Sequence, residues 1–243
     1  MTSSGRFATS VLLSVLLSTA AHAGDFAGFQ PIGFSKDGRV FAFEEYGIQD
    51  GSGFPYSNIF VIDTVEDRYL PGTPVRVRID DEAAGLGKAR AQSLAQAEKL
   101  IAENALRDQP GVLVAFNPMT EKTVEPASLS YNQYAIDPMA GGVFTLRIEP
   151  VALDVPEFCR DLNPDATGFR LRFKEIADQP VDRVVYEDTR IPDSRNCPVS
   201  YQLSGVMTYH PRDAKPLHVA LVLVRSYGFE GNDGRWIAVP VRP

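Results

Sequence analysis

The chain has 243 residues, of which 44% are hydrophobic, and a formal net charge of −7 at pH 7. This size and apolar fraction suit one large or two small globular domains with a sizeable core. The acidic balance argues against nucleic acid as a partner, because binding a phosphate backbone requires clustered lysines and arginines.

The first 23 residues have the pattern of a secretory signal peptide. Arg6 supplies the positive start, an apolar stretch follows over 11–20, and Ala21-His22-Ala23 fits the small residues that signal peptidase requires. This stretch is too short to span a membrane, and no later apolar run reaches spanning length, so we expect no transmembrane segment after signal removal. Cleavage after Ala23 would leave 220 residues (243 minus 23) and, without Arg6, a charge of −8. The expected location is periplasmic or secreted.

The first mature residue would be Gly24, and a lipid anchor would need a cysteine there, so we expect a soluble product. The two cysteines, Cys159 and Cys197, predict a disulfide, because an even pair in an oxidising compartment is normally oxidised. Closing 38 residue steps would stabilise the fold by about 3–4 kcal/mol. Reactive thiols or metal ligands are the alternatives, but the wide spacing is poor for a metal, and we predict no metal site.

Apolar runs after the cleavage site predict a short antiparallel meander. Strands are expected at 29–34, 39–46 and 56–63, with Asp37-Gly38 as a hairpin turn and a glycine-rich loop over 47–55. A further strand at 73–79 alternates apolar and basic residues.

Part of this meander resembles one repeat of the TolB-type β-propellers. The residues that carry the resemblance are Gly33–Phe43 and Asn58–Asp63, and no second copy follows. Because a propeller needs at least about four blades, we predict a meander and not a propeller.

One helix is expected, roughly over 82–107. Its apolar residues follow helical spacing and form one modest stripe that suits packing on a sheet. Asp80-Asp81 are expected to cap its start, and Arg107 near its end suits the helix dipole. The stripe consists of Leu86, Leu94, Ala97, Ile101 and Ala105.

From Gly111 onward the pattern favours an antiparallel β-sandwich. Strands are expected at 112–116, 142–148, 169–173, 199–209, 217–226 and 236–241, and no element is assigned over 119–138. The run 217–224 is apolar on both faces, so it should be a central strand, paired with 235–241. The predicted fold class is mainly β with one helix (α+β), divided near Gln109-Pro110-Gly111 into regions 24–110 and 111–243.

A wider resemblance covers nearly the whole mature chain. The stretch from Glu44 to Tyr56, the segment around Cys197 and Gly228-Phe229-Glu230-Gly231 resemble an uncharacterised family of predicted secreted proteins of Gram-negative bacteria. The resemblance implies export and a shared fold. It implies no known activity, so no catalytic residues are carried over.

Catalytic motifs are weak. There is no Gly-x-Ser-x-Gly motif, and His210 and His218 are more typical of ordinary strand and turn residues than of a base or ligand pair. Gly85-Leu86-Gly87-Lys88 lacks the residues of a phosphate loop, and the exported compartment has no ATP pool. We predict no cofactor and assign no catalytic residue.

The first candidate surface lies between Glu44 and Tyr56. Aromatic rings beside carboxylates suit sugar or peptide recognition, and paired acids can cleave glycosidic bonds. The alternative is a wide hairpin loop whose aromatics cover the sheet. Glu44 and Glu45 should point to opposite faces of a strand, which counts against an acid pair. The candidate binding residues are Glu45, Tyr46, Asp50, Phe54 and Tyr56, with Phe229 and Glu230 on a second loop.

The second candidate surface is a set of basic residues that alternate with apolar ones. If their strands are neighbours, they would form one cationic face for an anionic glycan or lipid headgroup. The alternative is a solvated outer face with interspersed carboxylates. The residues are Arg76, Arg78, Arg147, Arg170, Arg172 and Lys174.

Two functions are therefore open. We favour a non-catalytic binding or envelope-associated protein, with an envelope glycan, a lipid headgroup or another periplasmic protein as its partner. The alternative is a hydrolase of envelope glycan or peptide that uses carboxylates such as Glu45 and Asp50.

Overall fold

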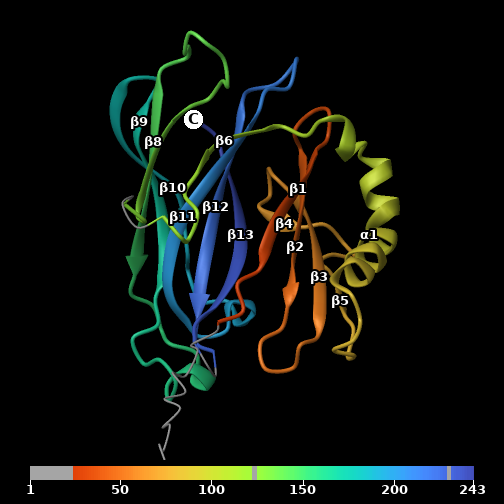
Figure 1. Cartoon of the computed structure of the whole chain (residues 1–243). Coiled ribbons are helices and arrows are strands. Elements are labelled where there is room, and N and C mark those ends of the chain that lie inside the picture. Colours follow the sequence, from red (N-terminus) through yellow and green to blue (C-terminus); the bar gives the residue numbers. More distant parts are fainter. Residues whose placement is uncertain (1–23, 122–124, 229–230) are drawn as a thin grey trace, which may run out of the picture.

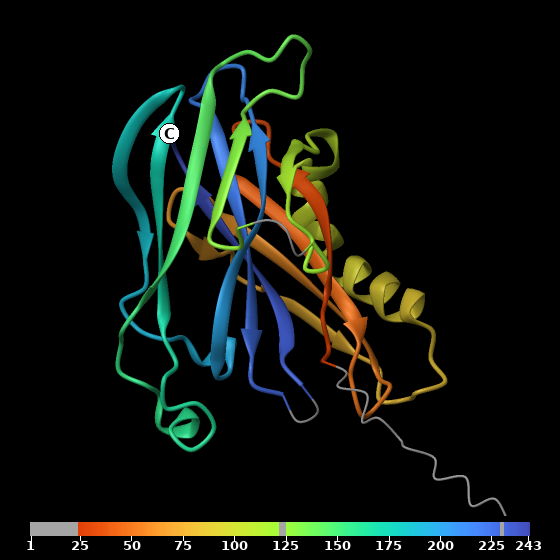
Figure 2. The ribbon, with the colours of Figure 1, turned by 60° about the vertical axis from the view of Figure 1, so that its left-hand side comes forward.

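The computed structural model of the protein describes residues 24–121, 125–228 and 231–243, so the signal peptide predicted at 1–23 lies outside the described residues. Within these residues, three antiparallel sheets and one α-helix, α1, stack as four layers (Figure 1). Figure 2 shows the same order after a turn of 60°, with α1 beyond the first sheet and the third sheet on the opposite side. The predicted class, mainly β with one helix and sandwich-like sheets, is confirmed.

The first sheet is the predicted meander. Its strands are β1 (Gly28–Phe34), β2 (Val40–Ile48), β3 (Pro55–Asp63), β4 (Arg68–Tyr69) and β5 (Val75–Arg78), and both β4 and β5 pair with β3. The β1–β2 hairpin turns where it was expected, because Gly38 accepts a φ of 73°. The Asp37 carboxylate holds the turn by accepting bonds from the Ser35 hydroxyl at 2.6 Å and the Arg39 N–H at 3.0 Å.

Helix α1 (Leu86–Glu103) covers the outer face of the first sheet. Its buried residues Ala97 and Ile101 pack against Ile59 and Val61 of β3, as the apolar stripe predicts. The helix is shorter than the predicted range at both ends. After it, Ala105 adopts a left-handed φ of 48° and the short 3₁₀ helix η1 (Leu106–Asp108) follows.

The predicted helix caps are wrong. The N-cap is Gly85, which has no side chain that could cap the helix. The two aspartates expected there make contacts before the helix begins. Asp80 pairs with Arg78, and the Asp81 carboxylate accepts a hydrogen bond from the Ala83 N–H at 3.0 Å. Arg107 lies beyond the helix.

The middle sheet has the strand order β13, β12, β11, β6. Its members are β6 (Val112–Phe116), β11 (Pro198–Tyr209), β12 (Leu217–Ser226) and β13 (Asp233–Val241). β12 is central and buried, as its apolar pattern predicts. Val219 and Leu221 on one face join the core of the first sheet, while Ala220 and Val222 on the other face join the core of the third sheet.

The third sheet contains two strands that the sequence pattern did not reveal. It is formed by β7 (Ser128–Asn132), β8 (Val143–Val151), β9 (Gly168–Ile176) and β10 (Gln179–Glu187). β7 lies in the stretch left unassigned. β10 is an edge strand with mostly exposed and half-buried side chains, so it lacks the apolar run that marks a buried strand.

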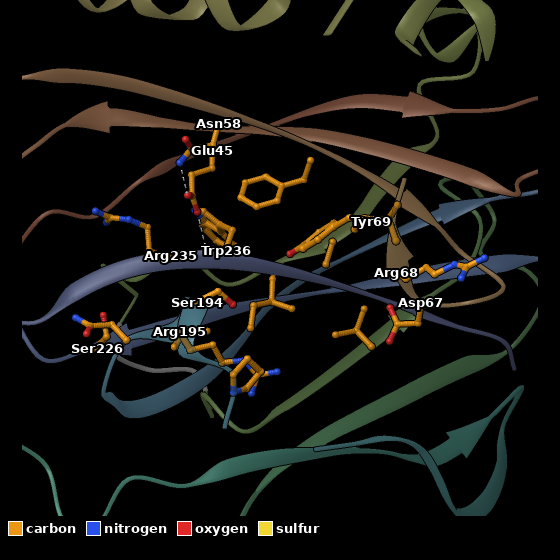
Figure 3. Close-up of a pocket in the computed structure, with 18 of the residues that line it drawn as sticks. Glu45, Asn58, Asp67, Arg68, Tyr69, Ser194, Arg195, Ser226, Arg235 and Trp236 are labelled. Carbon is orange, nitrogen blue, oxygen red and sulfur yellow. Dashed lines mark hydrogen bonds between the residues drawn. The ribbon is translucent and has the colours of Figure 1, made fainter. Parts of the chain in front are cut away.

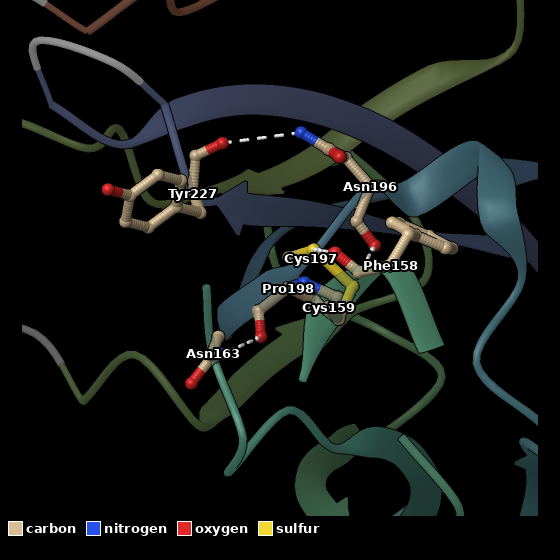
Figure 4. The surroundings of a disulfide bond; sticks show 7 residues. All are labelled: Phe158, Cys159, Asn163, Asn196, Cys197, Pro198 and Tyr227. Carbon is tan, nitrogen blue, oxygen red and sulfur yellow. Dashed lines mark hydrogen bonds between the residues drawn. A yellow bond between two sulfur atoms is a disulfide. The ribbon is translucent and has the colours of Figure 1, made fainter. Parts of the chain in front are cut away.

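The predicted disulfide joins Cys159 and Cys197 (Figure 4). Cys159 ends the 3₁₀ helix η2 (Glu157–Cys159), and Cys197 directly precedes β11. Side-chain amides close the same region, because Asn163 donates to the Pro198 carbonyl at 2.7 Å and Asn196 to the Tyr227 carbonyl at 3.2 Å. The loop before β11, which holds the 3₁₀ helix η3 (Asp193–Arg195), is thereby tied to the third sheet.

Candidate functional site

A cavity of about 580 Å³ lies where the edges of the three sheets meet (Figure 3). We call it the edge pocket. Its walls come from β2–β5 of the first sheet, from β12 and β13 of the middle sheet and from segment 186–196, which begins at the end of β10 in the third sheet. The side chains that matter below are Glu45, Asn58, Phe60, Arg68, Tyr69, Arg76, Arg190, Arg195, Arg235 and Trp236.

The strand register of the first sheet places one row of polar side chains in the pocket wall. Asn58 of β3 is paired with Glu45 of β2 on one side and with Arg76 of β5 on the other. Residues opposite one another on paired strands share a face, so these three side chains lie side by side. Phe60 is on the same face. The centre of its ring lies 5.6 Å from the Arg76 guanidinium and 5.6 Å from the centre of the Tyr69 ring.

Glu45 ties the first sheet to the middle sheet. Its buried carboxylate accepts the Asn58 side-chain amide at 3.0 Å and the backbone N–H of Trp236 at 2.9 Å. Desolvation raises the pKa of Glu45, while these hydrogen bonds and the charges of Arg235 and Arg76 act in the opposite direction. Figure 3 shows Glu45, Asn58 and Trp236 together at one end of the pocket.

The start of β13 is anchored by the first residues of the described chain. Asp25 pairs with Arg235 at 2.6 Å and accepts the Tyr56 hydroxyl at 2.9 Å. The Arg235 guanidinium also lies 5.0 Å from the centre of the Tyr56 ring. The Trp236 indole N–H donates to the Ala27 carbonyl at 2.7 Å. Arg235 is therefore a structural cation with a fixed partner.

The third wall carries a second neutralised cation. Arg195 of η3 is buried and pairs with Asp188, with Nη2 2.8 Å from Oδ1. The same aspartate accepts the Tyr186 hydroxyl at 2.7 Å, and the guanidinium lies 4.7 Å from the Phe169 ring centre. These contacts and the adjacent disulfide hold the loop that closes the pocket.

Three other arginines of the edge pocket have no acceptor within the described residues. The exposed side chains of Arg68, Arg76 and Arg190 form no ion pair or hydrogen bond there. The Arg76 guanidinium lies 5.6 Å from the centre of the Phe60 ring, and its charge also acts on Glu45. Asp67 also lines the pocket. Although Asp67 keeps exposed surface, desolvation by the walls raises its pKa to about 6, and the charge of Arg195 opposes that rise. The pocket therefore offers guanidinium donors to an anionic group.

Comparison with known proteins places the chain in a family. The family model described as Predicted secreted protein (DUF2259) matches residues 42–242. The chain belongs to this family. The wider resemblance, to a family of predicted secreted proteins, is thereby confirmed, and this family has no known function. The match does not test the resemblance to a TolB-type repeat. No curated protein matches the chain. In the part of the chain that the structure describes, no helix is long and apolar enough to cross a membrane.

The structure separates the residues of the first candidate surface. Glu45 lines the edge pocket, whereas Tyr56 does not line it and contacts Arg235. Asp50 instead lines a second, open pocket of about 640 Å³ beside the loop 48–53. Phe229 and Glu230 lie outside the described residues.

The remaining members of that surface also lie elsewhere. The Arg90 guanidinium of α1 lies 3.8 Å from the centre of the Tyr46 ring, and the Arg78 guanidinium lies 5.9 Å from the centre of the Phe54 ring. As strand alternation predicts, Glu44 points away from Glu45. It faces α1, where it pairs with Arg90 at 2.7 Å.

The second candidate surface depended on the basic strands being neighbours. The structure corrects this condition, because the six basic residues do not share one face. Arg76 and Arg78 belong to β5 of the first sheet, whereas the other four lie on β8 and β9 of the third. The middle sheet packs between these two sheets. The four cations of the third sheet and Arg78 have carboxylate partners, in the pairs Arg78–Asp80, Arg147–Glu149, Arg170–Glu187, Arg172–Glu149, Arg172–Asp182 and Lys174–Asp182.

Sequence reasoning found Glu45 and Arg76 but missed most of the edge pocket. Arg68 and Tyr69 follow a turn, and Arg190 and Arg195 lie in a loop without apolar periodicity. One signal was present: two arginines flank Pro192 shortly before Cys197, and a disulfide fixes such a loop. Nothing in the sequence indicates that this loop faces β4 and β13.

Proposed function

We propose that this protein is an exported, non-catalytic binding protein and that the edge pocket holds an anionic ligand. The observation that carries the proposal is the set of three arginines, Arg68, Arg76 and Arg190, whose donors have no acceptor in the described residues. The cations of the third sheet, by contrast, are paired with carboxylates. Membership of a predicted secreted family supports the exported location.

The size and lining of the pocket suit a small or extended ligand. A volume of about 580 Å³ lies within the usual range for ligand sites. Tyr69 and Phe60 add an aromatic surface beside the cations. Acidic envelope glycans, phosphorylated lipid headgroups and acidic segments of another periplasmic protein share the chemistry that these arginines recognise.

The hydrolase alternative gains no support from the geometry. Its two carboxylates, Glu45 and Asp50, line different pockets. Each oxygen of Glu45 accepts a hydrogen bond that holds the fold together. A glycosidase pair should instead converge on one cleft, roughly 5–10 Å apart.

We also propose cleavage of the signal peptide after Ala23. Asp25 and Ala27 exchange backbone hydrogen bonds with Gly234, so the chain is anchored directly after the proposed cleavage site. Amino-terminal sequencing of the exported protein should therefore begin at Gly24. Any other first residue would overturn this assignment.

The binding proposal is tested with the mature chain and three anionic probes. These are an oligogalacturonate, vesicles with phosphatidylglycerol, and an acidic peptide, each compared with a neutral counterpart. We expect at least one anionic probe to bind and the double substitution Arg68→Gln with Arg190→Gln to weaken its affinity by about tenfold or more. The matched control is Arg160→Gln with Arg212→Gln, two arginines that do not line the pocket. Equal effects of both pairs, or no anion binding, would overturn the proposal.

A further inference from the structure

The outer edge of β13 runs along the edge pocket. On this strand the even-numbered residues direct their backbone groups away from β12. The Gly234 N–H donates a hydrogen bond to the Asp25 carbonyl, and the Gly234 carbonyl accepts one from the Ala27 N–H. The Trp236 N–H donates to the Glu45 carboxylate. The pairing with β12 is unbroken from Asp233 to Val241, so Ala238 has the same outward direction.

Beyond the Trp236 N–H this edge has no partner. The Trp236 carbonyl, the Ala238 N–H and the Ala238 carbonyl make no hydrogen bond within the described residues. The next outward residue, Pro240, has no N–H to offer. The unpaired stretch therefore lies between a donor capped by Glu45 and a proline, and both Trp236 and Ala238 line the pocket.

The same edge already accepts an added segment at its other end. Phe26 forms a parallel bridge with Gly234, and Asp25 and Ala27 supply its two hydrogen bonds. The chain then leaves β13 to begin β1 at Gly28, in the first sheet. An unpaired edge is a template for a further strand where a strand can reach it. Trp236 and Ala238 are only 9% and 5% exposed, so an added strand would reach this edge through the edge pocket that they line.

We infer that the ligand of the edge pocket is an extended acidic peptide segment of a partner protein, which adds as a strand to β13 at Trp236 and Ala238. This inference rests on the proposed function. Main-chain bonds to the three unpaired groups would provide affinity that does not depend on sequence, over about 10 Å of edge at ~3.3 Å per residue. The arginines Arg68, Arg76 and Arg190 would select acidic side chains.

A single tryptophan makes the test direct. Trp236 is the one tryptophan of the chain, and it lines the pocket, so its fluorescence reports occupancy. The probe is the capped pentapeptide acetyl-Glu-Val-Glu-Val-Glu-amide, titrated into the mature chain at low salt. The same peptide with lysine in place of glutamate is the charge control, for which we expect at least tenfold weaker binding.

Methylation of the peptide backbone separates strand addition from simple charge attraction. Successive amides of a strand point in opposite directions, so only alternate amides can donate to β13. In a series of peptides with one N-methyl group each, we expect alternation. Methylation of amides that face β13 should weaken binding by about tenfold, and methylation of the others should have a smaller effect. Arg190→Gln should weaken binding of the parent peptide, whereas Arg212→Gln, at an exposed turn outside the pocket, should not.

The outcomes distinguish this inference from the proposed function. Peptide binding without alternation, or binding of the oligogalacturonate or the phosphatidylglycerol vesicles but not of the peptide, would overturn strand addition and leave an anionic ligand in place. If none of the anionic probes binds, both proposals fail.

Discussion

Buried polar side chains tie the layers of this protein together. Glu45 joins the first sheet to β13 through the Trp236 N–H, and Asp188 joins β10 to the pocket loop through Arg195. In each case the buried group has partners for its charge or its lone pairs, which offsets the cost of desolvation. His218 differs, because its buried Nε2 has no hydrogen-bond partner among the residues that the structure describes.

The surroundings of His218 predict a stability that depends on pH. The side chain is fully buried among aromatic rings, and its Nδ1 lies 2.8 Å from the Tyr131 hydroxyl. Desolvation, helped by the charge of His210, lowers its pKa to about 3. The unfolded chain binds a proton near pH 6.5 and the folded chain does not. This contribution is therefore complete above pH 6.5 and is lost as the pH falls from 6.5 toward 3.

Urea unfolding at pH 7 and pH 5 measures this loss. We expect the free energy of unfolding to fall by roughly 2 kcal/mol from this group alone, at about 1.4 kcal/mol per pH unit. His218→Gln, which does not titrate, should remove that part of the pH dependence. His210→Gln is the matched control and should retain most of it. Equal pH dependence of wild type and His218→Gln would contradict the assignment.

At the scale of elements, buried central strands were easier to predict from the sequence than edge strands and helix ends. Central strands such as β12 were predictable because burial on both faces demands a continuous apolar run. The edge strand β10 has no such run. The caps of α1 were mispredicted because Asp80 and Asp81 have closer partners, Arg78 and the Ala83 N–H, before the helix begins.

The disulfide should stabilise both the fold and one wall of the edge pocket. Cys197 follows Arg195 by two residues, so the bridge to Cys159 restrains the loop that carries Arg190 and Arg195. Replacing both cysteines with alanine should lower the free energy of unfolding by about 3–4 kcal/mol and weaken anion binding. Denaturation with and without reductant provides the measurement. The double variant should be insensitive to reductant, and an unreduced wild type that takes up two alkyl groups would contradict the bridge.

At the scale of the whole molecule, three sheets share two continuous cores. Phe43 of the first sheet packs in one cluster with Leu221 and Trp236 of the middle sheet. The two regions on either side of the predicted boundary at residues 110 and 111 therefore share one hydrophobic core. The edge pocket depends on the same arrangement, because no single sheet supplies all its walls.

This shared core predicts that the second region is not stable alone. A fragment of residues 111–243 would expose the face of β12 that carries Val219 and Leu221, which are buried in the full chain. We expect the fragment to lose cooperative urea unfolding, measured by circular dichroism, whereas the mature chain unfolds cooperatively. A fragment with a sharp transition would instead show that the boundary marks an autonomous domain.

The sequence by itself determined the class of fold, the meander, the one helix, the central position of β12, the disulfide and the family. These features follow from local periodicity, turn residues and the pairing of two cysteines. The edge pocket was decided only by the tertiary structure. Arg68, Arg190 and Ala238 are far apart in the chain, and none has a local pattern that marks it. They share a pocket because the register and stacking of three sheets bring their edges to one place.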